Sequence, residues 1–280
     1  MDIKFHCEVN NSFDDAHRHV RAFLYSDYSI PLHNHDFYEM NIIFKGKGTH
    51  MIENNRYPVE AGDVFVIPPM IAHAYYDTDG LDVYHVLFTR EFMNEIADEA
   101  STVPGFLSFV EIEPYLRQHC SDTVFLHLNP SKLLEIKAEL ATVEDGGAYD
   151  TEKLVPIKKH GVAKLLYELS YCLHGQLEAN SAPVRGKYDT AVISALEYIH
   201  LNYQSKITLS DLSRHTFLSR STLIRCFGEL CGCSPGEYLV NYRKGKALEL
   251  LASGAYSKTE IAYKCGFYDL SHMERMIKEG

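Results

Sequence analysis

One pattern occurs twice near the end of this 280-residue chain, and it constrains the fold more than any other feature. Each copy predicts an apolar helix, a short turn and a second helix that carries an arginine on its outer face. The matched positions are Leu212, Ser213, Leu218, Ser219, Leu223, Arg225 and Phe227, and then Ile261, Ala262, Phe267, Asp269, Met273, Arg275 and Ile277. A helix-turn-helix written twice is typical of proteins that read DNA.

The second helix of each copy is expected to enter the major groove. Candidate DNA contacts are the outer-face residues Arg220, Ser221, Thr222, Ile224 and Arg225, and Ser271, His272, Glu274 and Arg275. Arginine donates two hydrogen bonds to guanine, glutamate accepts a hydrogen bond from the amino group of cytosine, and isoleucine packs on the methyl group of thymine. The helix between the copies spans about 28 Å, close to one turn of B-DNA at about 34 Å. The alternative is a pair of plain helical hairpins whose arginines are solvated, and two in-register copies argue against it.

Charge divides the chain. The net charge is −11, yet residues 1–184 carry 14 basic and 28 acidic side chains, and residues 185–280 carry 13 and 10. Phosphates repel the acidic part, so only the second part is expected to face DNA. Residues 178–187 have the composition of a linker. No apolar run is long enough to cross a bilayer, and the odd number of cysteines, seven, indicates reduced thiols in a cytoplasmic protein.

The first part mixes two periodicities. Residues 20–90 hold short alternating runs between turns, which predict a β-sandwich or a small barrel. Residues 131–144 and 152–177 change to helical periodicity. A stripe formed by Leu165, Leu169 and Leu173 predicts that these two helices form the contact of a homodimer.

Polar residues in the predicted strands follow a cupin-like spacing. His33, His35, Glu39 and His73 would converge inside a small barrel, and three imidazoles with a carboxylate can hold Fe(II), Mn(II), Ni(II) or Zn(II). Alone, this pattern is typical of a metal-dependent oxygenase or isomerase. Met70 and Asp77 depart from it, because glycine and asparagine are usual there.

Two other interpretations of these residues stay open. In an effector pocket, polar side chains would bond a small molecule and aromatic rings would stack on it. The candidates for effector binding are His33, His35, Phe37, Tyr38, Glu39, His73 and Tyr75. In the third interpretation, some of these histidines are satisfied core residues.

Residues 189–280 resemble the AraC/XylS family of bacterial transcription regulators. The resemblance rests on residues 207–213, 218–227, 232–239 and, above all, 260–267, with Arg243, Ala247, Leu250 and Leu251. This sequence departs from the family at Ser213, Gly228, Met273 and Ile277. Family members often carry an N-terminal cupin-like domain that binds a small effector without catalysis, commonly a sugar. Residues 35–39 resemble those of the L-rhamnose regulators.

The resemblance and the residues together predict an α+β multidomain protein. We expect a cupin-like effector-binding domain over 1–128, a helical dimerisation segment over 129–180, a linker over 181–188 and a tandem helix-turn-helix domain over 189–280 that lacks the family's last helix. Its expected partners are double-stranded promoter DNA, a small-molecule effector, RNA polymerase and a second copy of the chain. No cofactor is required, although the cupin pocket can take a divalent metal. The rival function is a metal-dependent cupin enzyme with a helical appendage.

Overall fold

The computed structural model describes residues 3–13, 19–119, 126–147, 151–179 and 189–278. The chain divides into two compact units, Met1–Val184 and Arg185–Gly280, and each is described by itself. The predicted linker at 181–188 lies outside the described residues. Within the described ranges, the helices are all too short or too polar to cross a membrane.

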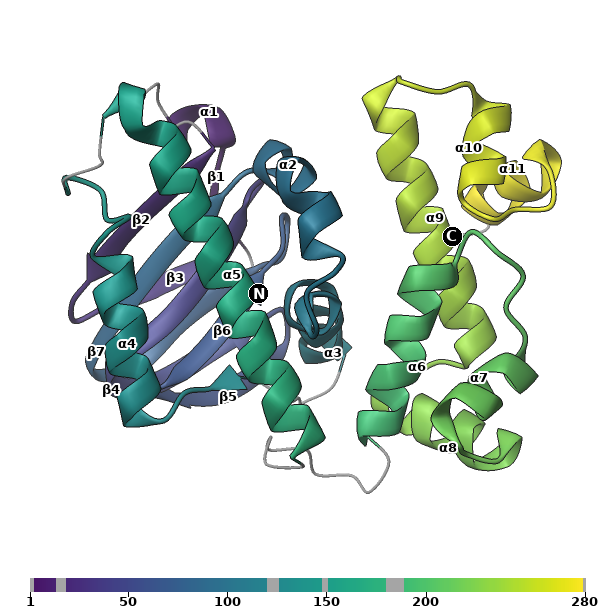
Figure 1. Cartoon of the computed structure of the whole chain (residues 1–280), viewed down its shortest axis with the longest axis horizontal. Helices are drawn as coiled ribbons and strands as arrows, with labels where there is room; N and C mark the ends of the chain where they lie inside the picture. Colours follow the sequence, from purple (N-terminus) through teal and green to yellow (C-terminus); the bar gives the residue numbers. More distant parts are fainter. Residues whose placement is uncertain (1–2, 14–18, 120–125, 148–150, 180–188, 279–280) are drawn as a thin grey trace. The chain divides into compact units, whose positions relative to one another are not determined.

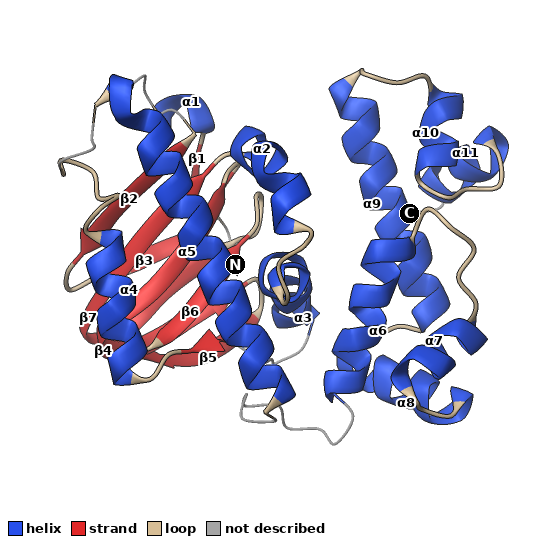
Figure 2. Cartoon of the chain, viewed as in Figure 1, coloured by secondary structure: helices blue, strands red, loops and turns tan. Residues whose placement is uncertain are grey.

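The first unit is built on one mainly antiparallel sheet (Figure 2). Its hydrogen-bonded order is β1-β3-β7-β4-β6-β8, with β2 on β7 and β5 on β4. The strands are β1 (Phe5–Cys7), β2 (Val20–Tyr25), β3 (Ile30–His35), β4 (Tyr38–Ile52), β5 (Asn55–Glu60), β6 (Asp63–Ile67), β7 (His73–Phe88) and β8 (Leu126–His127). Among these strands only β1 and β3 pair in parallel.

The two long strands β4 and β7 serve both halves of the sheet. The first half of β4 pairs with β6, and its second half pairs with β5. The strand β7 pairs with β4 over both halves. The register shifts between Ile43 and Thr49. Gly46 has a φ of +79° there, and a Cβ on it would lie 2.2 Å from the carbonyl oxygen of Gly80. Only glycine fits so close to a backbone, so this position fixes where the sheet bends.

Helices cover one face of the sheet, and α4 and α5 cross it in Figure 1. The elements are α1 (Val9–Ser12), α2 (Arg90–Ala100), a π-helical turn η1 (Ser108–Ile112), α3 (Glu113–His119), α4 (Pro130–Leu140), a 3₁₀ turn η2 (Glu152–Leu154) and α5 (Val155–Glu178). The stripe of Leu165, Leu169 and Leu173 is at most 1% exposed within the chain itself. These three leucines pack in the chain's own core, so they are not available to a second copy, and dimerisation through the two helices stays a prediction.

The second unit is all helical, as the sequence predicts. Its helices are α6 (Asp189–Asn202), α7 (Leu209–Thr216), α8 (Arg220–Cys231), α9 (Pro235–Ser253), α10 (Lys258–Lys264) and α11 (Leu270–Lys278). Capping boxes at Thr208, Ser234 and Ser257 satisfy the first N–H groups of α7, α9 and α10. The pairs α7–α8 and α10–α11 are the two predicted helix-turn-helix units, and α9 separates them by its 19 residues.

Candidate functional sites

The structure brings the four cupin-like side chains together. His33 stands opposite His73 where β3 pairs with β7, and their ring centroids lie 4.1 Å apart. His35 ends β3, and Glu39 enters from β4. All four residues are at most 5% exposed. The four-residue spacing also predicts a pocket that opens to solvent, and this prediction is wrong because the cluster is buried.

Backbone carbonyls fix the imidazoles of the cluster. The Nδ1 atom of His33 donates to Pro31 O at 3.0 Å, and that of His73 donates to Ile71 O at 3.2 Å. His35 Nδ1 donates to Phe37 O at 2.6 Å. Because a carbonyl can only accept, each Nδ1 carries a proton, and Nε2 is the ring nitrogen that faces the rest of the cluster. This is the arrangement that orients histidine ligands of metals.

Glu39 is the centre of the cluster. Its Oε2 atom lies 3.0 Å from His35 Nε2 and 3.6 Å from His73 Nε2, and its Oε1 accepts from His85 Nδ1 at 2.6 Å. Burial raises the pKa of the Glu39 carboxyl, but its interactions with these three imidazoles outweigh burial and hold the pKa well below its usual range. Burial, with a contribution from neighbouring His73, lowers the pKa of His33 to about 4.

The donor atoms of His33, Glu39 and His73 lie within 4.8 Å of one another. His35 contacts Glu39 but stands outside this set of three. Within the described residues, the buried Nε2 atoms of His35, His73 and His85 make no hydrogen bond, although those of His35 and His73 lie 3.0 and 3.6 Å from Glu39 Oε2. Buried polar atoms of this kind need water, an ion or a polar ligand.

Aromatic rings fill the space around the cluster. Phe37 stacks on His35 at 4.5 Å, and Tyr75 stacks on the buried His50 at 4.1 Å. Tyr38 lies elsewhere, since side chains alternate along a strand and its ring stacks on Phe88 at 5.4 Å. The prediction that Tyr38 lines this site is wrong for that reason.

Sequence reasoning missed His85, which holds the second oxygen of Glu39. It pairs with Asn41 across β4 and β7, beyond the register shifts in these strands. A histidine in a run of apolar strand residues was the available signal. Its partner could not be predicted, because the bend decides which half of β7 faces Glu39.

On α8, the outer face carries the predicted arginine. The Arg225 side chain is 57% exposed, and its Nη1 donates to both carboxylate oxygens of Glu229, at 2.8 and 2.9 Å. Arg220 instead reaches back to Ser210 Oγ at 2.6 Å. The hydroxyls of Ser221 and Thr222 bond to the N-cap Ser219, at 3.1 and 2.8 Å.

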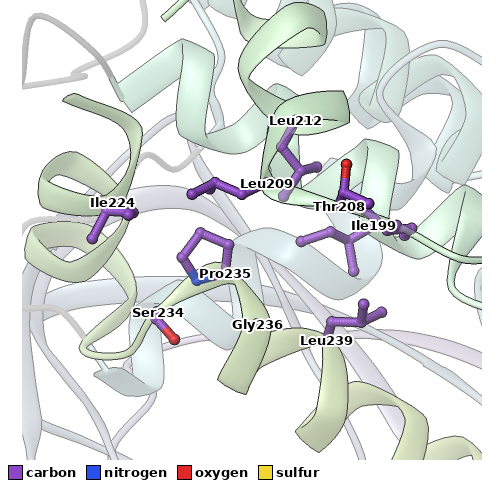
Figure 3. Close-up of a pocket in the computed structure, with 10 residues that line it drawn as sticks. Ile199, Thr208, Leu209, Leu212, Ile224, Ser234, Pro235, Gly236 and Leu239 are labelled. Atoms are coloured by element: carbon purple, nitrogen blue, oxygen red, sulfur yellow. The ribbon is translucent and has the colours of Figure 1, made fainter. Parts of the chain in front are cut away.

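Ile224 also lines an apolar groove between α6, α7, α8 and α9 (Figure 3). The groove has a volume of about 240 Å³. Its lining residues are Ile199, Ile207, Thr208, Leu209, Leu212, Ile224, Ser234, Pro235, Gly236 and Leu239. Ile224 is 46% exposed, so it is accessible from the outer face as well.

The second unit repeats the arrangement on α11. Ser271 and Arg275 are exposed, and Met273 is buried in the core with Ile261 and Phe267. Glu274 lies 3.6 Å from Lys258 Nζ on α10. His272 Nδ1 accepts from the Tyr268 backbone N–H at 3.4 Å, which orients its ring.

Comparison with known families defines the class of protein. Residues 21–141 match an AraC-like ligand binding domain, and residues 212–279 match a helix-turn-helix domain. The chain belongs to the AraC/XylS-type transcription regulators, in which a ligand-binding unit precedes a DNA-binding unit.

The curated relatives narrow the resemblance. They include proteins named HTH-type transcriptional activator RhaS from Yersinia pestis bv. Antiqua (strain Angola) and from Yersinia pseudotuberculosis serotype O:1b (strain IP 31758). Each is 27% identical over 252 residues, which cover 89% of this chain and 85% of the relative. The chain thus resembles the rhamnose regulators.

Two solved structures show detectable similarity to this chain. ToxT from Vibrio cholerae is 11% identical with a TM-score of 0.34, and the match covers 93% of this chain and 94% of that chain. A probable AraC family transcriptional regulator from Rhodopseudomonas palustris CGA009 is 32% identical with a TM-score of 0.30, over 32% of this chain and 84% of that chain.

Proposed function

We propose that the protein is a cytoplasmic activator of transcription that binds double-stranded promoter DNA and is controlled by what its N-terminal unit binds. The observation that carries the proposal is the pair of in-register helix-turn-helix units attached to an AraC-like ligand-binding unit. Relatives named as activators support the direction of control. An activator would contact RNA polymerase as well as DNA.

Base readout falls to Arg225 and Arg275 in this proposal, because both are exposed at matched positions on α8 and α11. Selecting duplexes from a randomised library with the full chain would test sequence-specific binding. The expected result is one enriched sequence whose retardation weakens steeply as salt rises. Enrichment of no sequence would contradict the proposed function.

The buried cluster is proposed to hold a divalent cation through His33, Glu39 and His73, with His35 beside them. The residues fit such an ion, since two or three Nε2 lone pairs and a carboxylate match Zn(II), Ni(II) or Fe(II). The proposal is supported by the donor atoms of His33, Glu39 and His73, which lie within 4.8 Å of one another, and by the buried Nε2 atoms of His35 and His73, which make no hydrogen bond. A bound cation would add positive charge beside Glu39 and stabilise the folded unit.

A small effector such as a sugar is the second candidate for this unit. Phe37 and Tyr75 would stack on it, and His50 and Asn41 hold further buried polar atoms without partners. The rings around Glu39 pack at 4 to 5 Å, which favours an ion at the cluster itself. The burial of the cluster also favours binding over turnover, so we propose a regulator and not a cupin enzyme.

Homodimerisation is proposed through the outward faces of α4 and α5. Leu134 and Tyr171 are exposed there, whereas the leucine stripe is buried. Sedimentation of the full chain and of Tyr171→Asp would test this. A wild-type monomer at tens of micromolar, an order-of-magnitude choice for weak interfaces, would contradict it.

Elemental analysis and thermal melting test the cation. The melting temperature is expected to fall after chelation and to recover with Zn(II) or Ni(II). His73→Ala should abolish the recovery, whereas His160→Ala, an exposed histidine on α5, should keep it. If neither metal nor neutral sugars shift the melting temperature, the ligand-binding role of the cluster fails, while specific DNA binding can still stand.

A further inference from the structure

We infer that Glu229 is a specificity-determining residue of the first helix-turn-helix unit, which acts by holding the guanidinium of Arg225. The inference rests on the proposed function, in which Arg225 reads a base pair. Glu229 is absent from the residues expected to contact DNA, and its role comes from its position beside Arg225.

Glu229 lies one helical turn after Arg225 on α8, and both of its carboxylate oxygens accept from Arg225 Nη1. The two side chains are 57% and 61% exposed. An exposed pair at this spacing contributes little to stability. The Arg225–Glu229 pair matters for DNA binding instead. The pair sets the orientation of the Arg225 guanidinium and reduces the positive charge that this group presents to DNA.

Base and phosphate make different demands on this arginine. Guanine offers two neutral acceptors and uses two of the five N–H donors of a guanidinium. Arg225 can therefore keep Nη1 on Glu229 while other N–H groups meet a guanine. A phosphate brings negative charge next to the Glu229 carboxylate, and the two repel each other. Glu229 thus weakens the contact of Arg225 with a phosphate, which carries no sequence information. It leaves the contact of Arg225 with a guanine, which does carry sequence information.

The sequence repeats the spacing in the second unit, where Glu279 stands four residues after Arg275. Glu274 on α11 instead contacts Lys258. An arginine followed by a glutamate four residues later therefore occurs in both units of the sequence.

The test compares Glu229→Gln with wild type in the full chain. Binding is measured by fluorescence anisotropy at several KCl concentrations, on a duplex selected by the wild type from a random library and on a scrambled duplex. Glu249→Gln on α9 is the matched control, because it removes an equal charge from a pair with Lys246. Circular dichroism confirms that each variant is folded.

Glu229→Gln is expected to bind the scrambled duplex about 3- to 10-fold more tightly, with a salt slope steeper by up to about 0.9. The ratio of selected to scrambled affinity should fall by about the same factor. Glu249→Gln should leave that ratio unchanged.

The same increase for Glu229→Gln in an Arg225→Ala background would overturn the inference, because Glu229 would then act as a plain negative charge. An unchanged affinity ratio in the single variant would overturn it too. The proposed function fails in a different way, through a wild-type protein that selects no sequence or an Arg225→Ala variant that keeps full preference.

Discussion

Replacing Glu113 by glutamine is expected to remove a pH dependence of stability from the first unit. Glu113 begins α3 and is 5% exposed, and Arg117 on the same helix is 1% exposed. Arg117 Nε donates to Glu113 Oε1 at 2.9 Å, and its guanidinium lies 4.7 Å from the ring centroid of Phe65. Burial raises the pKa of Glu113 to about 7, although the charge of Arg117 opposes the change.

The sign follows from which state holds the proton. In the unfolded chain the carboxyl titrates at 4.5, whereas in the folded chain it titrates at about 7. Between these values the folded state binds one more proton, so the free energy of unfolding falls as pH rises, by about 1.4 kcal/mol per pH unit. The stabilisation is fully present below pH 4.5 and is lost as pH rises through about 7, a total of about 3 kcal/mol.

Urea unfolding at pH 5, 6, 7 and 8, followed by circular dichroism, would measure the effect. Histidines titrate in the same range, so the informative quantity is the difference between wild type and Glu113→Gln. Wild type should lose about 2 to 3 kcal/mol more than the variant over this range. Glu135→Gln, which removes a carboxylate that is 60% exposed on α4, should follow wild type. Parallel pH profiles for wild type and Glu113→Gln would refute the assignment.

Four further substitutions test the packing and the DNA face. Lys158→Met should destabilise the first unit by about 3 kcal/mol in urea unfolding, because Lys158 is 1% exposed and pairs with Asp145. Gly266→Ala should cost more than about 2 kcal/mol, because φ is +73° and a Cβ would lie 2.5 Å from a backbone oxygen. Gly254→Ala, where φ is +64° in open space, should cost only about 1 kcal/mol. Arg225→Ala should lose about 1–3 kcal/mol at its base pair in a competition assay with single-base variants.

The second unit could be predicted almost completely, because its signals are local. N-caps such as Ser219 and Ser234, and the period of the apolar residues, fix each helix within a turn. The turn of the first helix-turn-helix unit holds details that the apolar period does not contain. The hydroxyl of Ser213, where the family prefers alanine, donates to the carbonyl of Leu218 in the turn. Phe217 adopts a φ of +57° in that turn and is 95% exposed.

The first unit was predictable in its elements and only partly in its contacts. Periodicity shows that Leu165, Leu169 and Leu173 face something apolar, but it cannot distinguish the chain's own sheet from a second copy. Met70 and Asp77, which replace the usual glycine and asparagine, have φ values of +69° and +51°. Both residues thus adopt the left-handed region, which aspartate visits readily and methionine rarely does.

A path of contacts joins the buried cluster to α5, the last described helix of the first unit. His85 bonds to Glu39 in the cluster and stacks on Phe23 of β2 at 5.5 Å. The next residue back along β2, Ala22, donates its N–H to Asp145 at 3.0 Å. Asp145 in turn pairs with Lys158 on α5. A ligand that changes the position of Glu39 has a contiguous route to this helix.

A contiguous path of contacts does not by itself establish coupling between ligand binding and DNA affinity, so the coupling free energy must be measured. Asp145→Asn keeps the shape of the side chain and removes the charge that binds Lys158 and Arg21. If the Asp145 contact transmits the effect of ligand binding to the DNA-binding unit, the ligand should still raise the melting temperature of the variant. The ligand should, however, change the DNA affinity of the variant several-fold less than that of wild type. A coupling free energy of about 1–3 kcal/mol corresponds to a change of about 5- to 150-fold in affinity. Glu152→Gln, an exposed carboxylate in η2, serves as the control. A full ligand effect on DNA binding in Asp145→Asn would show that the signal leaves the cluster by another route.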